Sequence, residues 1–338
     1  MKVNDQPPVR AAIVGLGKFA HSLAKACLAS ECIDIVACQT RTAAKAAAFA
    51  ETYGCKAYTS YDELLSDDNV EAVILVTPNN LHAGQTIAAA AAGKHVFVEK
   101  PVCNTLDEAD AMIAATTEAG RLLAVGYQER RRSTYRHIKK LIETGALGRI
   151  HAFEANHCGN LLAIWPPDDW RFTKEGGIGP ILHKGSHKID VLNYLFGAAE
   201  TVATIGAPLD FNPEVDATTV SAIRFANGIV GSLSTGFAHT NASLNVFGVD
   251  RSVFFSGYGT VIKIKDEKEW TFETVDCGPD RPVIEELSEF AGAIRGRGKI
   301  EVDGVAGRNA LRLALALHEA GLTGLTQRLS QPGDHTER

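Results

Sequence analysis

The stretch Gly15-Leu16-Gly17-Lys18-Phe19-Ala20 has the residue types and the spacing of a phosphate-binding turn. It follows an apolar run that ends at Val14, and it leads into a segment with helical periodicity, Ala20–Ala29. In a G-x-G-x-x-A turn the first glycine permits a tight bend, and the second lets a pyrophosphate approach the backbone. The free N–H groups at the start of the following helix attract the anion. We therefore expect a dinucleotide site here, and a purely structural turn is the alternative.

The residue about twenty positions after the first glycine distinguishes NAD from NADP in such a site. At that distance the sequence reads Gln39-Thr40-Arg41, with no acidic residue to accept from a ribose 2′-hydroxyl. Thr40 and Arg41 can instead donate to a 2′-phosphate, because a guanidinium presents a fork of donors that matches a phosphate. The pattern favours NADP. The alternative is that Arg41 lies over the adenine or in solvent and that both cofactors are used.

Lys100 stands directly after an apolar run, His95–Val98, that predicts a strand. It belongs to the triplet Glu99-Lys100-Pro101. Ligands of an open parallel sheet bind beyond the carboxyl ends of the strands, so Lys100 is expected at the nicotinamide end of the site. The residues alone leave open that Lys100 is a solvated lysine at the start of a loop.

His183, His187 and Asp190 stand within one predicted helix, Ile181–Phe196, where positions three and four apart share a face. An imidazole titrates near neutral pH and therefore suits proton transfer to or from a hydroxyl. A structural role for the imidazoles is an alternative, and a metal site is another. Because the spacing lacks the glutamate of the H-E-x-x-H metalloprotease motif, and no further ligand is evident, we expect no metal.

Two kinds of sheet are expected to position these residues. Up to residue 126, strand-like apolar runs alternate with helical segments and short joins, which predicts a doubly wound parallel sheet with helices on both faces. From residue 201 to 275, short runs of alternating character predict a large, open, mostly antiparallel sheet with one solvated face. The fold class is therefore α/β, with a Rossmann domain at 1–126, a second α/β domain at 127–330, for which substrate binding and oligomerisation are implied only by the family resemblance given below, and a polar tail at 331–338.

The net charge of −6 on 338 residues has no strong local asymmetry, which argues against nucleic acid or a membrane surface as a partner. The single basic run, Arg130-Arg131-Arg132, is expected to be solvated or to face the substrate. No apolar run approaches a membrane span, and Met1–Pro8 lacks the apolar core of a secretion signal. Seven cysteines without a C-x-x-C pair fit a reducing compartment, so we expect a cytoplasmic protein.

Four motifs along the chain match one known family. They are Gly15-Leu-Gly-Lys-Phe-Ala20, Thr77-Pro-Asn-Asn-Leu-His82, Ala92-Gly-Lys-His-Val-Phe-Val-Glu-Lys-Pro101 and Gly185-Ser-His-Lys-Ile-Asp190. Through these motifs the chain resembles the Gfo/Idh/MocA oxidoreductases from about residue 9 to residue 322. The resemblance implies hydride transfer between NAD(P) and a CH–OH or C=O carbon of a small carbohydrate, polyol or related molecule. It also implies a homodimer or homotetramer formed through the second sheet.

The same resemblance implies roles for individual residues. Lys100 is the implied catalytic lysine, preceding a cis proline at Pro101, and His187 is the implied proton donor or acceptor, with His183 beside it. The expected cofactor contacts are Gly15, Leu16, Gly17, Lys18, Phe19, Thr40, Arg41, Thr77, Pro78, Asn79, His82, Glu99 and Lys100. The expected substrate contacts are Lys100, Tyr127, Arg130, Asn156, Trp170, Arg171, His183 and His187.

One position departs from the family pattern, because His183 occupies the slot of an aspartate in the usual D-x-G-x-H-x-x-D motif. A neutral imidazole replaces only part of what a carboxylate does there, so the reaction class carries over while the substrate and the proton relay do not. Two rival functions stay open at this point. One is an NAD-dependent glycosidase of the same fold, and the other is a cofactor-binding regulator without catalysis.

Overall fold

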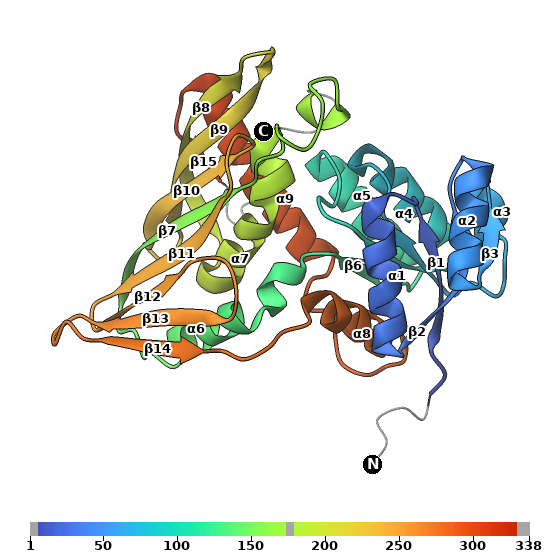
Figure 1. The fold of residues 1–338 in the computed structure, drawn as a ribbon, viewed down its shortest axis with the longest axis horizontal. Coiled ribbons are helices and arrows are strands. Elements are labelled where there is room, and N and C mark those ends of the chain that lie inside the picture. The colour runs from blue at the N-terminus through green and yellow to red at the C-terminus, as the bar shows by residue number, and fades with distance from the viewer. Residues whose placement is uncertain (1–5, 174–178, 330–338) are drawn as a thin grey trace. The chain divides into compact units, whose positions relative to one another are not determined.

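The chain folds into two compact units, shown in a computed structural model that describes residues 6–173 and 179–329 (Figure 1). The first unit contains the chain up to Gln128 together with Arg281–Arg308, and the second contains Glu129–Asp280 and the chain from Asn309 onward. The segment 281–308, which the sequence-based division placed in the second domain, thus belongs to the first unit. The expected tail at 331–338 lies outside the described residues.

The first unit is built on a parallel six-stranded sheet in the order β3-β2-β1-β4-β5-β6. Its strands are β1 (Val9–Val14), β2 (Ile33–Gln39), β3 (Lys56–Tyr58), β4 (Ala72–Leu75), β5 (His95–Val98) and β6 (Leu123–Val125). The strand order reverses between β1 and β4, and the carboxyl ends of strands at such a point form a ligand-binding crevice. The predicted doubly wound Rossmann sheet is confirmed.

Helices complete the first unit. They are α1 (Lys18–Ser30), α2 (Ala43–Tyr53), α3 (Tyr61–Leu65), α4 (His82–Ala91), α5 (Leu106–Glu118) and α8 (Pro282–Ile294), with one 3₁₀ turn, η1 (Asn79–Leu81). Leu287 and Phe290 of α8 are fully buried in the same hydrophobic cluster as α1 and β1. Arg295, directly after α8, donates from both terminal nitrogens to the two carboxylate oxygens of Glu71 at 2.9 Å. These contacts explain why the segment 281–308 folds with the Rossmann sheet.

The second unit is built on a nine-stranded sheet in the order β14-β13-β12-β11-β7-β10-β9-β8-β15. Its strands are β7 (Ile150–Cys158), β8 (Ala199–Leu209), β9 (Asn212–Phe225), β10 (Val230–Gly236), β11 (Asn241–Gly248), β12 (Arg251–Phe255), β13 (Val261–Asp266), β14 (Phe272–Asp276) and β15 (Gln327–Arg328). Only β7 and β10 pair in parallel among the described strands of this sheet. The predicted large, mostly antiparallel sheet is confirmed.

One face of this sheet is covered and the other is not. Beside this sheet the chain forms 3₁₀ turns and helices. They are η2 (Gln128–Arg131), η3 (Trp170–Phe172), α6 (Ser133–Glu143), α7 (Ser186–Phe196) and α9 (Gly304–Thr323). The helix α9 begins in the first unit. The rings of Phe153, Phe196 and Phe225 contact one another where α7 packs on the sheet. On the opposite face the cross-strand partners Ile205 and Val220 are 81% and 52% exposed.

The predicted single helix Ile181–Phe196 is two pieces. Ile181–Gly185 forms one π-helical turn, labelled η4, and the α-helix α7 begins only at Ser186. A π turn holds more residues than an α turn, so the α-helical spacing behind the expected shared face of His183 and His187 does not apply. The sequence signal was misleading because one apolar periodicity runs through both pieces.

Two further features concern the whole described chain. All seven cysteines carry free thiols. Within residues 6–173 and 179–329, no helix combines the length and the apolar character that crossing a membrane requires.

Candidate active site

The glycine turn after β1 has the geometry that a pyrophosphate needs. Gly15 has a φ of +90°, and a Cβ added there would lie 2.8 Å from backbone atoms of Val76 and Thr77, so no side chain fits. Gly17 precedes α1, and no side chain caps that helix or adds an acid to its first turn. A Cβ at Gly17 would meet no atom within 4 Å, which leaves the backbone open to a ligand. The turn therefore fits the phosphates of a dinucleotide.

Some residues next to this turn pack inside the unit, and others are exposed. Leu16 packs against the hydrophobic cluster of the first unit, while Lys18 and Phe19 are exposed. Beyond β2, Thr40 donates its backbone N–H to the Tyr58 carbonyl, and Arg41 is exposed. The helix α2 starts next to them with no side-chain cap and no acidic residue in its first turn. Backbone N–H groups and an exposed guanidinium thus lie near the end of β2, and both favour an anion.

The motif after β4 is fastened to the motif after β5. The His82 ring is buried, with Nε2 2.9 Å from the Thr77 carbonyl oxygen and Nδ1 3.0 Å from the Pro101 carbonyl oxygen. His82 thus joins two loops inside the fold, whereas a cofactor contact at this position was expected. Asn79 is also buried and donates to the Asn104 side chain at 2.5 Å, while the neighbouring Pro78 is exposed.

Lys100 lies at the carboxyl end of β5, and the peptide bond between Lys100 and Pro101 is cis, as the resemblance implied. Glu99 is buried, and its carboxylate accepts the backbone N–H of Lys100 at 3.2 Å. Gly126 lies against that carboxylate, since a Cβ there would be 2.8 Å from Glu99 Oε1. Burial raises the pKa of Glu99 to about 7, against the attraction of the Lys100 charge. Tyr127, an expected substrate contact, is fully buried in this unit.

In the second unit the structure brings His187 together with a residue that sequence reasoning missed. The rings of His187 and His157 stack with centroids 6.1 Å apart and an angle of 22°. The ring of His183 lies near that of Phe237, with centroids 6.2 Å apart.

Asn156, an expected substrate contact, points away from His187. Its amide donates to Ser243 Oγ at 2.8 Å, on the face of β7 opposite to His157. Side chains alternate between the two faces of a strand, so adjacent residues cannot both face α7. His157 therefore shares the inward face of β7 with its buried neighbours Phe153 and Ala155, and Asn156 lies on the other face.

Arg130 is engaged in a buried ion pair instead of facing a substrate. Its guanidinium donates through Nε and Nη2 to the two carboxylate oxygens of Asp190, and both side chains are almost fully enclosed. The carboxylate of Asp190 is therefore engaged by an arginine. The pair ties η2 to α7, which holds the helix that carries His187.

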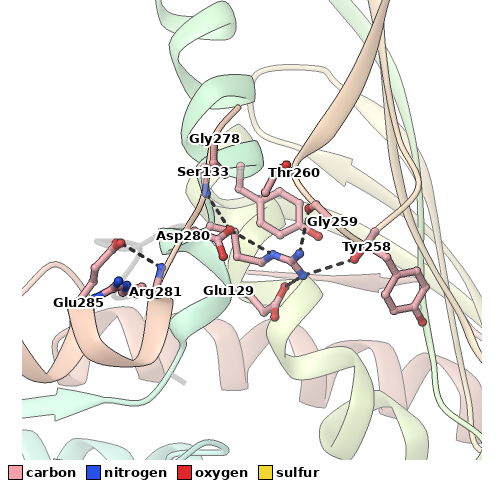
Figure 2. A network of polar contacts seen from close by, with 12 residues as sticks. Glu129, Ser133, Tyr258, Gly259, Thr260, Gly278, Asp280, Arg281 and Glu285 are labelled. Atoms are coloured by element: carbon pink, nitrogen blue, oxygen red, sulfur yellow. Dashed lines mark hydrogen bonds and ion pairs between the residues drawn. The ribbon is translucent and has the colours of Figure 1, made fainter. Parts of the chain in front are cut away.

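The run Arg130-Arg131-Arg132 is not solvated as a whole, which contradicts the first of its two expected settings, and Arg132 lines a cavity of this unit. Arg130 and Arg131 are buried. The network in Figure 2 surrounds the Arg132 guanidinium, which lies 3.6 Å from Glu129, 3.7 Å from Asp280 and 3.1 Å from the Gly259 carbonyl. Ser133 completes the network by donating its backbone N–H to Asp280 at 3.2 Å. Basic side chains here hold the loops of the second unit together.

Arg171 also has an internal partner, since it donates to both carboxylate oxygens of Asp169 and lies 4.2 Å from the centroid of the Trp165 ring. The backbone of Trp170 belongs to η3, and its side chain lies outside what the structure describes.

Next to His187, the buried Lys188 donates to Tyr135 Oη at 2.5 Å. Burial lowers the pKa of Lys188 to about 7.

A cavity of about 470 Å³ opens in the second unit beside these residues. Its polar side chains are Glu129, Arg132, Tyr135, His157, Asn160, Lys184, Thr240 and Tyr258. His157 both lines this cavity and stacks on His187, so the cavity adjoins the implied proton donor. Within the described residues no group of three or more His, Cys, Asp or Glu side chains is arranged to hold a metal ion.

Comparison with known proteins agrees with this architecture. Residues 9–127 match the model of an oxidoreductase family with an NAD-binding Rossmann fold, and residues 135–254 match the GFO/IDH/MocA C-terminal domain. The 1,5-anhydro-D-fructose reductase of Ensifer adhaerens is 31% identical over 86% of this chain and 90% of that protein. The levoglucosan dehydrogenase of Pseudarthrobacter phenanthrenivorans is 30% identical over 76% and 75%.

A solved structure shows the same likeness. The WlbA dehydrogenase from Bordetella pertussis, in complex with NADH and UDP-GlcNAcA, superposes with a TM-score of 0.84 and 27% identity over 96% of this chain and 99% of that one. Fold and glycine turn thus define an oxidoreductase with an NAD-binding Rossmann domain. The chain belongs to the Gfo/Idh/MocA family.

The buried Glu99 gives the first testable prediction. Its pKa is about 7 in the folded protein against 4.5 for the free group, so the folded state binds more protons between these pH values. The stabilisation that proton binding to Glu99 gives the folded state is therefore lost as the pH rises from 5 to 7, and the free energy of unfolding falls. Glu99→Gln has no carboxyl that can titrate, so its free energy of unfolding should not fall in this way. Relative to the wild type, the free energy of unfolding of the variant in urea should therefore increase by about 1–3 kcal/mol from pH 5 to pH 8. Glu118→Gln, at an exposed position, should follow wild type, and parallel curves for all three proteins would contradict the assignment.

Proposed function

We propose that the protein is an NADP-preferring dehydrogenase or reductase that acts on a CH–OH or C=O carbon of a sugar, polyol or related carbohydrate. The observation that carries the proposal is the open start of α1 behind Gly15, at the point where the strand order reverses. The names of the two relatives support the substrate class, since both act on carbohydrate derivatives.

In this proposal the first unit holds the cofactor. The backbone around Gly15 and Gly17 would bind the pyrophosphate, and Thr40 and Arg41 would bind the 2′-phosphate, because the window after β2 offers donors and no acid. The loop from Thr77 to Asn79, which His82 fastens in place, would line the nicotinamide ribose. The nicotinamide, when bound, supplies or accepts the hydride.

The side chains of this chain supply the rest of the chemistry. Lys100 would donate a hydrogen bond to the substrate oxygen and stabilise negative charge that develops on it. His187 would accept the hydroxyl proton in oxidation and return it in reduction, since an imidazole suits proton transfer near neutral pH. Asp190 and Arg130 would keep the start of α7 in position, and His157 would support the ring of His187 by stacking on it.

Cofactor choice is tested at Arg41. A guanidinium that pairs with the 2′-phosphate contributes to NADPH binding alone, so Arg41→Ala should raise the Kd of NADPH about tenfold or more and that of NADH less than about twofold. Fluorescence titration measures both constants. The control Lys25→Ala removes an exposed positive charge from α1 and should leave both unchanged. Tighter binding of NADH than NADPH by the wild type would reverse the proposed preference.

Catalysis is tested at the two implied residues. Lys100→Met and His187→Asn should each lower kcat by about 10²- to 10⁴-fold on the best substrate of a sugar and polyol panel, because each removes a proton donor or acceptor of the reaction. The Kd of NADPH should change less than about threefold, since binding energy comes mainly from the phosphates. Exposed-site controls are Lys25→Met and His151→Asn.

The same assay separates the rival functions. A dehydrogenase forms one reduced nicotinamide for each substrate oxidised, whereas a glycosidase that oxidises transiently returns its cofactor unchanged. A regulator without catalysis would bind the cofactor and turn over nothing. Variants of Lys100 and His187 with wild-type rates would also refute the proposed roles.

We further propose that the open face of the nine-stranded sheet forms a homodimer or homotetramer interface in the cytoplasm. Ile205 and Val220 support the interface, because exposed apolar side chains paired across two strands gain from burial in an assembly. The free thiols support a reducing compartment.

The oligomer is tested by sedimentation velocity. The wild type should sediment as a dimer or tetramer, and Ile205→Lys combined with Val220→Lys should shift it to a monomer, because each change would bury an unpaired charge in the interface. Val249→Lys alters another exposed apolar residue of the same unit and should leave the assembly intact. A monomeric wild type would refute the interface.

A further inference from the structure

Lys184 is built into the cavity of the second unit in a way that the proposed function does not use. It lies in the π turn between His183 and Gly185, half-buried, and its side chain lines the cavity. The side chain passes over Gly159, where an added Cβ would come within 2.7 Å of Lys184 Nζ and within 2.5 Å of Cε. Because glycine has no side chain, position 159 leaves space for the side chain of Lys184.

The ammonium of Lys184 has no hydrogen-bond or ion-pair partner in the part of the chain that the structure describes. Its own π turn and the residues up to Lys188 contain no acid, and the next acid along α7, Asp190, is held by Arg130. Burial lowers the pKa of Lys184, and the nearby charges of Cys158 and Glu129 oppose this shift without cancelling it.

The other charges around the cavity are already engaged. Glu129, the acid in the lining, lies 3.6 Å from Arg132. The guanidinium of Arg132 is held in turn by Asp280 and by the carbonyls of Gly257 and Gly259 (Figure 2). Among the described residues Lys184 therefore has only the more distant attraction of Glu129 and Cys158 and no ion pair or hydrogen bond, so the cavity presents its ammonium to a ligand that enters.

We propose that this cavity binds a carboxylate of the substrate through Lys184, so that the substrate is a sugar acid or a related hydroxy acid. The inference rests on the proposed function for the reaction itself. A partly desolvated ammonium gains most from a charge-assisted hydrogen bond to an anion. One lysine matches the single charge of a carboxylate, whereas a phosphate ester carries more charge than this lining balances. Asn160, Thr240 and Tyr258 supply the amide and hydroxyl groups that suit sugar hydroxyls.

The size and the place of the cavity agree with this ligand. A volume of about 470 Å³ lies within the range of roughly 300–1,000 Å³ of small-molecule sites. His157 lines the cavity and stacks on His187, so a molecule whose carboxylate pairs with Lys184 lies beside the implied proton donor.

Isothermal titration calorimetry tests the proposal with three matched pairs: D-glucuronate and D-glucose, D-galacturonate and D-galactose, D-gluconate and D-sorbitol. Each is titrated into the full protein without nicotinamide, so that no hydride transfer adds to the heat. At least one acid should bind about tenfold or more tighter than its neutral partner, because a desolvated pair with Lys184 favours the anion. In Lys184→Gln the ratio should fall below about threefold, since the amide keeps a donor and loses the charge.

Two further variants complete the experiment. Lys184→Arg should keep the preference for the acid, and it tests the charge even if the glutamine variant fails to fold. Lys140→Gln removes an exposed lysine of α6 in the same unit and should bind as the wild type does.

The proposal is overturned if no acid binds better than its neutral partner, if the preference survives in Lys184→Gln, or if glucose 6-phosphate binds better than every acid. These results are read from heat and do not depend on turnover. Failure of the proposed function has a different signature, which is loss of nicotinamide binding or of hydride transfer on every substrate.

Discussion

The close approach of Gly15 to Thr77 is the contact on which the cofactor half of the molecule depends. No Cβ fits there, so the turn after β1 lies directly against the loop after β4. His82 then links Thr77 to Pro101, next to Lys100. A continuous chain of backbone contacts thus joins the phosphate-binding turn to the implied catalytic lysine. Because these contacts are made by backbone atoms and one enclosed imidazole, the relative placement of the two motifs tolerates little change.

The second unit positions its chemistry with buried charges. Arg130 forms a bidentate ion pair with Asp190, and Lys188 donates to Tyr135. Both Lys188 and Asp190 lie near the start of α7. Burying a charge costs desolvation free energy, so buried ion pairs are weak evidence for added stability. Their geometry is directional, however, so they fix the register of the helix that carries His187. The π turn before α7 serves the same end, since it places His183 and Lys184 differently from an α-helical continuation.

Charge balance links the site to its ligand. The first unit offers helix starts without acids, and the second offers a lysine without a described partner, so both are complementary to anions. These local features favour anions although the chain as a whole carries a net charge of −6. Glu99 fits the same picture, because burial disfavours its charged form beside Lys100.

Local patterns in the sequence determined much of this protein. Glycine spacing and apolar strand runs identified the Rossmann sheet, because each depends on neighbours in the chain, and the family resemblance implied the cis proline after Lys100. Tertiary structure alone decided the partner of Arg130, which lies 60 residues away, and the return of α8 to the first unit. It also decided that His157 and not Asn156 faces His187. Alternation separates two faces of a strand, but only packing of the whole unit determines which face is covered.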